Sequence, residues 1–312
     1  MSAPTYASLV APLREAAVQA AWVQWSGISF GAAAQGKSAQ AVVDPDALVL
    51  ASLAFESDLR RFGKVLHIWL RSGVRLLSTA RISNLVRDYP QAMRGKLASL
   101  AADAVALGDA RWRRLAGKAK GSGRVERAVA EPVTPNLRLP CAMMLRLRLA
   151  LGVGIKADAM TFLLGSAHRA TVRQVAQGTG YADRAVRRAV EDLVAARFVD
   201  TVPTSPVSYA VPSQRWYPLL GVDDNTVPLW RWWHEVYVIA RALVDWGEQA
   251  DAAGWTRYVA GSRLRDVFER LTPLTSRAYV REHPDWSAAP DTWLEGPQPW
   301  VKELVELMRA ML

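Results

Sequence analysis

The sequence predicts a mainly α-helical protein of several domains, with a helix-turn-helix and a small β-hairpin at its centre. Apolar residues recur at helical spacing over most of the chain. Residues 171–193 have the pattern of two short helices joined by a glycine turn. Two β-prone runs around a proline-marked tip follow directly. With 312 residues, of which 51% are hydrophobic and 22% charged, the chain is long and apolar enough for two or three domains.

The first third of the chain is predicted to be helical. Its apolar spacing predicts an amphipathic helix over 8–25. Asp44 is a suitable N-cap, and Pro45 suits the first position of the next helix. Helices are expected at 45–55, 57–71, 78–88, 91–107 and 110–116. A basic Gly/Ser segment at 118–123 and three prolines within 129–140 then predict a linker.

The most consistent local pattern lies in residues 171–193. Thr171 and Gln174 have the spacing of a capping box, in which each side chain bonds to the other residue's backbone N–H. Gly180 follows the first helix, where glycine adopts a positive φ without a Cβ clash. The second helix is expected over 182–196, with a buried stripe formed by Val186, Ala189, Val190, Leu193 and Val194.

A β-hairpin is predicted immediately after the second helix. Residues 198–202 and 207–211 are β-prone, and the tip at 203–206 has a proline at each end. Upstream, residues 157–165 are expected to form a helix that supports the pair.

A helix-turn-helix followed at once by a hairpin resembles the winged-helix regulators of bacteria, such as the MarR and ArsR types. The resemblance covers about residues 139–211 and rests on Ala176, Gly180, Val186 and the segment 196–200. It implies a DNA-binding protein, most simply a transcriptional regulator, whose second helix enters the major groove. It also implies a homodimer, because such regulators match two half-sites on DNA.

The resemblance further implies which residues contact DNA. Base contacts would come from the start of the second helix, at Asp183, Arg184, Arg187 and Arg188. Thr171, Arg173 and Gln174 would lie near the phosphate backbone, and Thr204 and Ser205 would approach DNA from the hairpin tip. Apart from the resemblance, the basic faces of the first region suggest phosphate contacts at Arg60, Arg61, Lys64, Arg111, Arg113 and Arg114.

A second interpretation of the same helix stays open. Asp183–Arg187, Arg187–Glu191 and Arg188–Asp192 are i,i+4 pairs that would stabilise an exposed helix. The hairpin tip has no Lys or Arg, whereas many wings place a cation in the minor groove. Because winged helices also bind proteins, an interaction subunit or adaptor is the alternative hypothesis. Likewise, the helical spacing of the segment Arg111–Arg114 is more typical of a Trp112 that packs inward, with the arginines on the solvated side.

The last hundred residues are predicted to be helical and contain 9 of the 13 tryptophans. A connection is expected at 212–228, with helices at 229–251, 263–271 and 300–312, the second of which ends near Pro273. The last helix is amphipathic, so its apolar face needs a cover, either in its own domain or in a second subunit. The tryptophans suggest a core, or alternatively a pocket for a small ligand or a site for a protein partner.

The chain is thus expected to comprise a basic helical domain at 1–128, a linker at 129–138, the DNA-binding unit at 139–212 and a Trp-rich helical domain at 213–312. The net charge is +10. Residues 60–127 carry 16 basic and 4 acidic side chains, and residues 138–200 carry 10 and 5. Such a field attracts a polyanion in a salt-dependent way. We expect double-stranded DNA as the partner, although RNA or an acidic protein would also suit the field.

Composition and terminal pattern indicate the compartment. The single cysteine, Cys141, forms no internal disulfide, and the N-terminus lacks the pattern of a signal peptide, so a cytoplasmic protein is expected. The most apolar stretch, 141–155, is interrupted by Arg146 and Arg148 and is too short to span a bilayer. No membrane association is expected.

One motif could indicate enzyme chemistry. Gly31–Ser38 matches the GxxxxGK[ST] phosphate loop, but Asp44 and Pro45 interrupt the helix that such a loop opens, so a nucleotide-binding enzyme is a remote alternative. The histidines His67, His168, His234 and His283 have no second ligand at metal spacing. The pair His234-Glu235 is expected on an ordinary helix surface. We therefore predict no catalytic residues, no metal and no cofactor.

Overall fold

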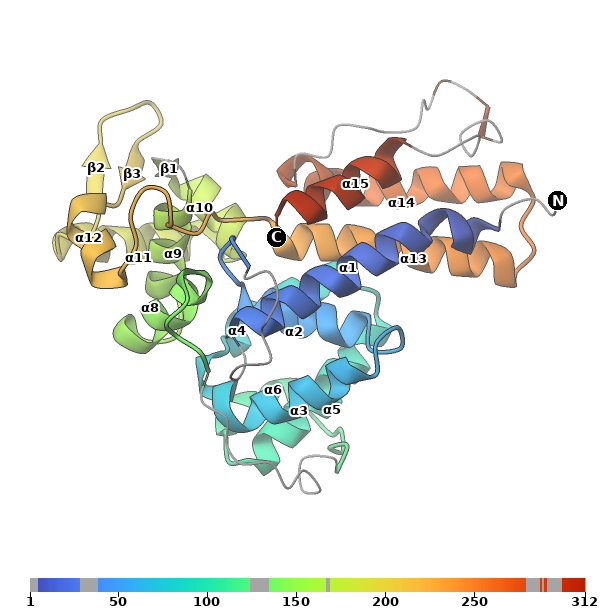
Figure 1. Cartoon of the computed structure of the whole chain (residues 1–312), viewed down its shortest axis with the longest axis horizontal. Helices are drawn as coiled ribbons and strands as arrows, with labels where there is room; N and C mark the ends of the chain where they lie inside the picture. Colours follow the sequence, from blue (N-terminus) through green and yellow to red (C-terminus); the bar gives the residue numbers. More distant parts are fainter. Residues whose placement is uncertain are drawn as a thin grey trace.

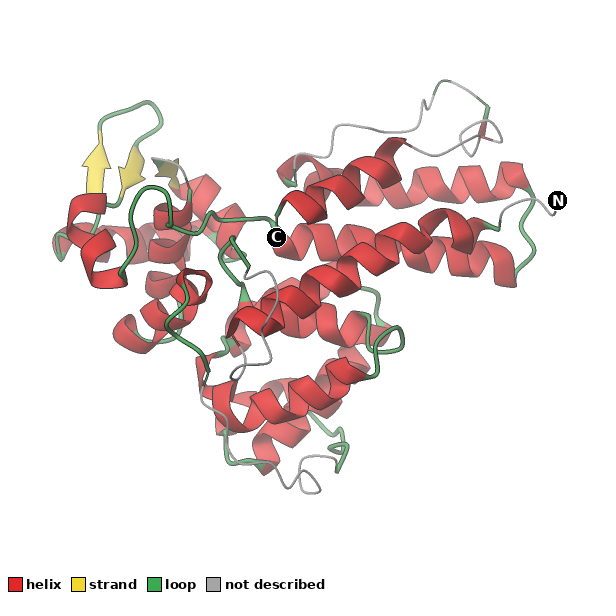
Figure 2. Cartoon of the chain, viewed as in Figure 1, coloured by secondary structure: helices red, strands yellow, loops and turns green. Residues whose placement is uncertain are grey.

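The computed structural model describes residues 5–28, 39–123, 135–166, 169–278, 287, 289–290 and 299–311. These residues are mainly helical, as predicted, and their strands form one small three-stranded sheet. Figure 2 shows this sheet at one end of the molecule, beside a body of helices. Among the described residues, no helix has both the length and the apolar character that crossing a bilayer requires.

The first region folds into six α-helices among its described residues. These are α1 (Tyr6–Ile28), α2 (Pro45–Ala54), α3 (Arg61–Gly73), α4 (Thr79–Leu85), α5 (Ala92–Ala106) and α6 (Arg113–Ala116), with the 3-10 turns η2 (Val74–Leu76), η3 (Val86–Asp88) and η4 (Ala110–Trp112). The expected start of α2 is confirmed, because Asp44 Oδ1 accepts hydrogen bonds from the backbone N–H groups of Asp46 and Ala47, at 3.2 and 3.1 Å. Helix α3 begins later than expected, since residues 55–58 form a turn.

The central region contains the sheet. Its elements are η5 (Pro140–Ala142), α8 (Met143–Leu151), α9 (Ile155–Gly165), β1 (Ala170–Thr171), α10 (Val172–Thr179), α11 (Asp183–Ala195), β2 (Asp200–Val202) and β3 (Ser208–Ala210). Strand β3 lies between β1 and β2 and is antiparallel to both, with Tyr209 opposite Ala170 on one side and Thr201 on the other. The predicted hairpin is confirmed with shorter strands. Strand β1 was not predicted, because two residues are too few to show a period.

The last region contains α12 (Ser213–Leu220), α13 (Trp233–Ala252), α14 (Arg257–Arg277) and α15 (Pro299–Ala310). It departs from the sequence prediction at α12 and at the bounds of α13 and α14, the latter of which begins six residues earlier than expected. The segment 212–228, expected to be a connection, includes α12, whose start follows Pro212. Helix α14 continues through Pro273, where an end was expected. Leu271 and Leu274, on either side of that proline, are buried, so tertiary packing outweighs the cost of proline in the helix.

The buried side chains form two cores that do not follow the order of the chain. The larger core contains side chains from α1 through α6 and from α13, α14 and α15. The sequence analysis had placed these two sets of helices in separate domains. The smaller core joins α8 to α11, the sheet and α12. Figure 1 shows α1 lying along α13 and α15. The apolar face of α15 is therefore covered by its own chain and needs no second copy as a cover.

Several of the described tryptophans of the last region are structural. Trp233, Trp246 and Trp300 are buried in the larger core, which confirms the core interpretation for these three. Trp230 is buried in the smaller core and Trp232 is half-buried, and both also line a cavity beside α10.

Candidate nucleic-acid interface

The turn between α10 and α11 is fixed by local hydrogen bonds. Gln174 Oε1 accepts from the Thr171 backbone N–H at 2.8 Å, and Thr171 Oγ1 accepts from the Gln174 N–H at 3.3 Å, so the capping box is confirmed. Gly180 has a φ of +73°, and its N–H donates to Ala176 O at 2.9 Å. The positive φ favours glycine here, and a Cβ would lie 2.7 Å from Leu85 Cδ2, so the Leu85 side chain would have to shift.

Helices α10 and α11 bury the faces that the sequence indicated. Val186, Ala189, Val190 and Leu193 are buried, and Val194 is half-buried. On α10, a Cβ at Gly178 would overlap the ring of Phe162 in α9, so this glycine lets the two helices approach closely. The apolar stripe thus fixes which side of α11 points outward.

The outward side of α11 carries exposed, unpaired arginines. Asp183, Arg184, Arg187 and Arg188 are all exposed. None of the three arginines forms an ion pair within 4.0 Å or a hydrogen bond with the described part of the chain, so the expected i,i+4 pairs are absent. Asp192 pairs instead with Lys156 of α9, with an Nζ–Oδ2 distance of 2.9 Å. Three cations of α11 are therefore free to bind an external anion.

The predicted backbone contacts on α10 have different roles. Thr171 and Gln174 use polar atoms for the capping box, and Thr171 is half-buried. Arg173 is exposed and lines, together with Gln174 and Arg169, the cavity beside α10. Arg173 is thus the charged group of this set that is available to a partner.

The hairpin tip is uncharged and internally bonded. Thr204 Oγ1 lies 2.9 Å from Pro206 O and 2.8 Å from Ser208 Oγ, and the side chain is half-buried. Ser205 is exposed. The tip therefore offers a partner a small polar surface and no cation.

The basic candidates of the first region do not extend the α11 surface. Arg60, Arg61 and Lys64 are exposed at the start of α3, and Arg113 and Arg114 are exposed on α6. Arg111 is held by Asp109 at 2.6 Å and by Val74 O at 3.1 Å, while Trp112 is buried, which confirms its inward packing. Figure 1 shows α3 and α6 well apart from α11.

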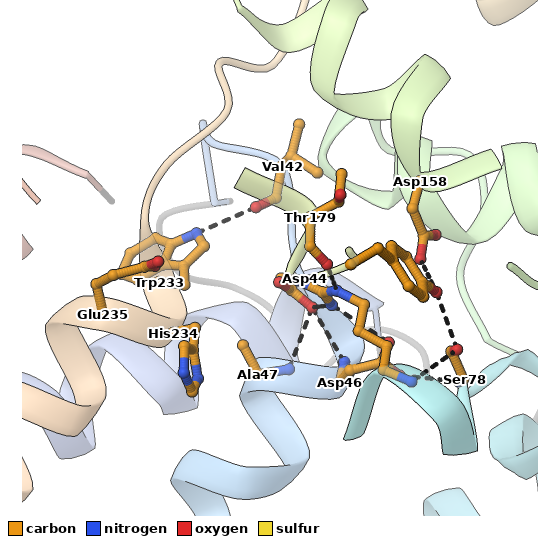
Figure 3. Close-up of polar contacts among 12 residues, drawn as sticks. Val42, Asp44, Asp46, Ala47, Ser78, Asp158, Thr179, Trp233, His234 and Glu235 are labelled. Atoms are coloured by element: carbon orange, nitrogen blue, oxygen red, sulfur yellow. Dashed lines mark hydrogen bonds and ion pairs between the residues drawn. The ribbon is translucent and has the colours of Figure 1, made fainter. Parts of the chain in front are cut away.

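A buried ionic network, which the sequence analysis did not predict, holds the turn against the first region (Figure 3). Arg81 of α4 donates through Nε to Thr179 O at 2.5 Å and through Nη1 to Asp44 Oδ1 at 2.5 Å. Asn84 Nδ2 donates to Gly180 O at 3.2 Å. Burial alone would raise the pKa of Asp44, but the charge and hydrogen bonds of Arg81 outweigh it and lower that pKa.

The second half of the network is centred on Arg148 of α8. Its guanidinium donates to Asp158 Oδ1 at 2.7 Å and to Asp46 Oδ2 at 2.6 Å, and all three side chains are fully buried. Tyr181, just before α11, donates to Asp158 Oδ2 at 2.9 Å and lies 3.0 Å from Ser78 Oγ of α4's N-cap. Burial, then the charge of Asp158, raises the pKa of Tyr181, so the hydroxyl keeps its proton and donates.

The predicted surface position of His234 and Glu235 is wrong. Each is 4% exposed, because the first turn of α13 packs against η3 and the end of α14. His234 Nε2 lies 2.8 Å from Asp88 Oδ2, and Arg277 Nη1 lies 3.6 Å from Glu235 Oε1. Burial raises the pKa of Glu235. These residues line a cavity of about 310 Å³ that reaches the start of α11.

The remaining chemical candidates receive no structural support. The phosphate-loop match at 31–38, His168 and His283 lie outside the described residues. His67 is buried in the first region, where its Nε2 lies 3.3 Å from Asp103 Oδ2. Within the described residues, no group of three His, Cys, Asp or Glu side chains is arranged to hold a metal ion.

Comparison with known proteins finds no family model, no curated protein and no solved structure that matches this chain. We therefore infer its function from its own geometry.

Proposed function

We propose that residues 139–212 form a winged helix-turn-helix and that the protein binds double-stranded DNA through α11, as a transcriptional regulator. The order of elements supports this proposal. Helix α9, strand β1, helices α10 and α11, and the hairpin β2–β3 follow one another, and β3 pairs with both β1 and β2. A helix-turn-helix with a hairpin beside it is a common way to present a helix to the major groove.

The single observation that carries the proposal is the outer face of α11. Arg184, Arg187 and Arg188 are exposed and have no ionic partner among the described residues. An arginine can donate two hydrogen bonds to the major-groove edge of guanine, and each such bidentate contact favours guanine over other bases by about 1–3 kcal/mol. These arginines do not form the i,i+4 pairs along α11 that would stabilise a solvated helix.

The buried network supports the same function at the level of orientation. Arg81 holds Thr179, Asn84 holds Gly180 and Asp158 accepts from Tyr181, so the backbone before α11 is bound to helices of both cores. A recognition helix needs a fixed orientation in the protein, because contacts to the DNA backbone fix the register in which its side chains meet the bases. The basic groups on α3 and α6 lie elsewhere and would add only a long-range field.

A protein-binding role for the same unit is the second candidate, and the hairpin tip favours it. Pro203 to Pro206 contains no cation, and Thr204 bonds within the tip. A wing of this kind gains little from the minor groove. In this case a stoichiometric partner would co-purify with the protein and cover α11.

Fluorescence anisotropy with labelled duplexes tests the proposal. We expect binding to random duplex DNA that weakens about 10-fold or more between 50 and 200 mM salt, because cations on phosphates release counterions. Arg184→Ala with Arg188→Ala should lower the affinity for a selected duplex more than the affinity for random DNA.

The matched control is Arg87→Ala with Arg94→Ala, which removes two exposed charges from η3 and α5. This variant should keep its preference for the selected duplex. Failure to bind DNA at low salt, or an equal loss of preference in the control, would overturn the proposal.

A further inference from the structure

A large cavity lies between α10 and the last region of the chain. Its volume is about 960 Å³, within the range typical of small-molecule sites. One wall is the start of α10, and the opposite walls come from the segment before α13, the end of α14 and the end of α15. The cavity therefore joins the helix-turn-helix to the larger core.

The described lining of this cavity is strongly positive. Arg169, Arg173, Arg231 and Arg277 contribute to it, and no Asp or Glu does. Arg277 lies 3.6 Å from Glu235. The other three have no ion-pair partner among the described residues. Arg169 and Arg173 are exposed whereas Arg231 is half-buried, so positive charge extends from the rim inward.

The inner wall combines unsatisfied donors with aromatic surface. Trp230 and Arg231 line both this cavity and the neighbouring one of about 310 Å³. Arg231 Nε and Trp230 Nε1 are buried without a hydrogen-bond partner, which is a costly arrangement that an acceptor would relieve. Trp230 and Trp232 pack edge-on against Phe162, and their ring centroids lie 5.3 and 6.2 Å, respectively, from the centroid of the Phe162 ring. Leu307 and Met311 add aliphatic surface from the C-terminal helix.

We propose that this cavity binds a small organic anion with a flat apolar body. Its acidic group would lie among Arg173, Arg231 and Arg277, because guanidinium groups bind carboxylates and phosphates through paired hydrogen bonds. Its body would contact Trp230 and Trp232. A DNA duplex is too wide to enter a cavity of this size and would reach only the rim. The inference does not rest on the DNA-binding proposal, and the two surfaces share Arg173 at the rim.

Titration calorimetry with the full chain and no DNA tests the site. The probes are 2-naphthoate and adenosine 5′-monophosphate, which carry a carboxylate and a phosphate on an aromatic body. At least one should bind at one site per chain with a Kd below about 1 mM, and the stronger probe identifies the acidic group preferred. Two comparison ligands each lack one feature: 2-naphthamide has no charge, and inorganic phosphate has no apolar body. Each should bind at least about 10-fold more weakly than the anionic aromatic probe that it matches.

Variants locate the site. Arg231→Gln should raise the Kd of the probe about 10-fold or more. If that variant does not fold, Arg173→Gln replaces it, because Arg173 is exposed, and the same rise in Kd is expected. Arg94→Gln on α5 is the matched control and should leave the Kd unchanged. Absence of saturable binding by both anionic probes would overturn the proposal. So would an unchanged Kd in the folded arginine variants. Loss of DNA affinity in these variants without any probe binding would identify the rim as DNA-contacting surface instead.

Discussion

Arg148 is a buried residue of α8 that connects the two cores. It is fully buried between Asp46 of α2 and Asp158 of α9, and it also donates to Leu76 O at 2.8 Å. Removing one member of a buried ion pair is strongly destabilising because it leaves a charge without compensation. The network therefore acts as a fixed contact between α2, α4, α8 and α9.

Arg148→Met should lower the free energy of unfolding by about 3–5 kcal/mol, because it leaves two buried carboxylates poorly paired. Urea denaturation followed by tryptophan fluorescence measures this loss. The control is Lys156→Met, which breaks the exposed pair with Asp192 and should cost at most about 1 kcal/mol. A loss for Arg148→Met of about 1 kcal/mol or less, no larger than that of Lys156→Met, would show that the buried network stabilises the fold no more than an exposed ion pair does.

Asp44 should make stability sensitive to acid. The pKa of Asp44 is lower in the folded protein than in the unfolded chain. Its contribution to the free energy of unfolding is therefore complete above the pKa of the unfolded chain, about 3.9, and is lost as the pH falls through the pKa of the folded protein. Melting temperatures between pH 6 and pH 3 measure the effect. The wild-type Tm should fall more steeply below about pH 4 than that of Asp44→Asn. Parallel curves would contradict this account of the pair with Arg81.

At the scale of elements, local chemistry explains what the sequence could predict. The capping box at Thr171, the glycine turn at Gly180 and the N-cap at Asp44 involve residues within a few positions of one another, and all three are confirmed. The partners of Arg81 could not be predicted in this way, because Asp44 and Thr179 are 37 and 98 residues away. For Arg148 a signal did exist, since a charge within the apolar stretch 141–155 needs a partner and Asp158 follows ten residues later.

The turn between α10 and α11 should be the least tolerant element of the candidate interface. Gly180→Ala forces a positive φ on a residue with a Cβ and crowds Leu85, so it should cost more than about 1 kcal/mol. Thermal unfolding measures the cost.

The control for this prediction is Gly95→Ala. Gly95 lies in α5 with nothing within 4 Å of a Cβ, so alanine should be neutral or stabilise by up to about 1 kcal/mol. A Gly180→Ala protein as stable as the Gly95→Ala protein would mean that the turn is not constrained as described.

At the scale of the whole molecule, the first and last regions should unfold together. Leu13 of α1 and Leu304 of α15 are both fully buried in the larger core. Each change to Ala should cost about 2–5 kcal/mol and lower the midpoint of the same transition. Differential scanning calorimetry separates the alternatives, because separate domains would give two transitions, each moved by only one variant.

The shared core could not be predicted from the sequence, because the pairing of α1 with α13 and α15 depends on contacts over more than two hundred residues. Amphipathic spacing showed that the apolar face of α15 must pack against another surface. It did not show whether that surface belongs to the same chain or to a second copy. The cover is α1, so a homodimer now depends only on the analogy with DNA-binding regulators and stays a prediction.

Site-directed cross-linking tests most directly whether the outer face of α11 meets DNA. Glu191→Cys places a thiol on that face, one turn from Arg187, where a photoactivatable label can be attached. The native Cys141 is buried, and burial raises its pKa to about 11, so it should not compete for the label. Arg94→Cys on α5 provides the matched label on another surface. We predict cross-links to duplex DNA from position 191 and few from position 94. Cross-links from position 94 alone, or none to DNA under conditions where the protein binds it, would contradict the account.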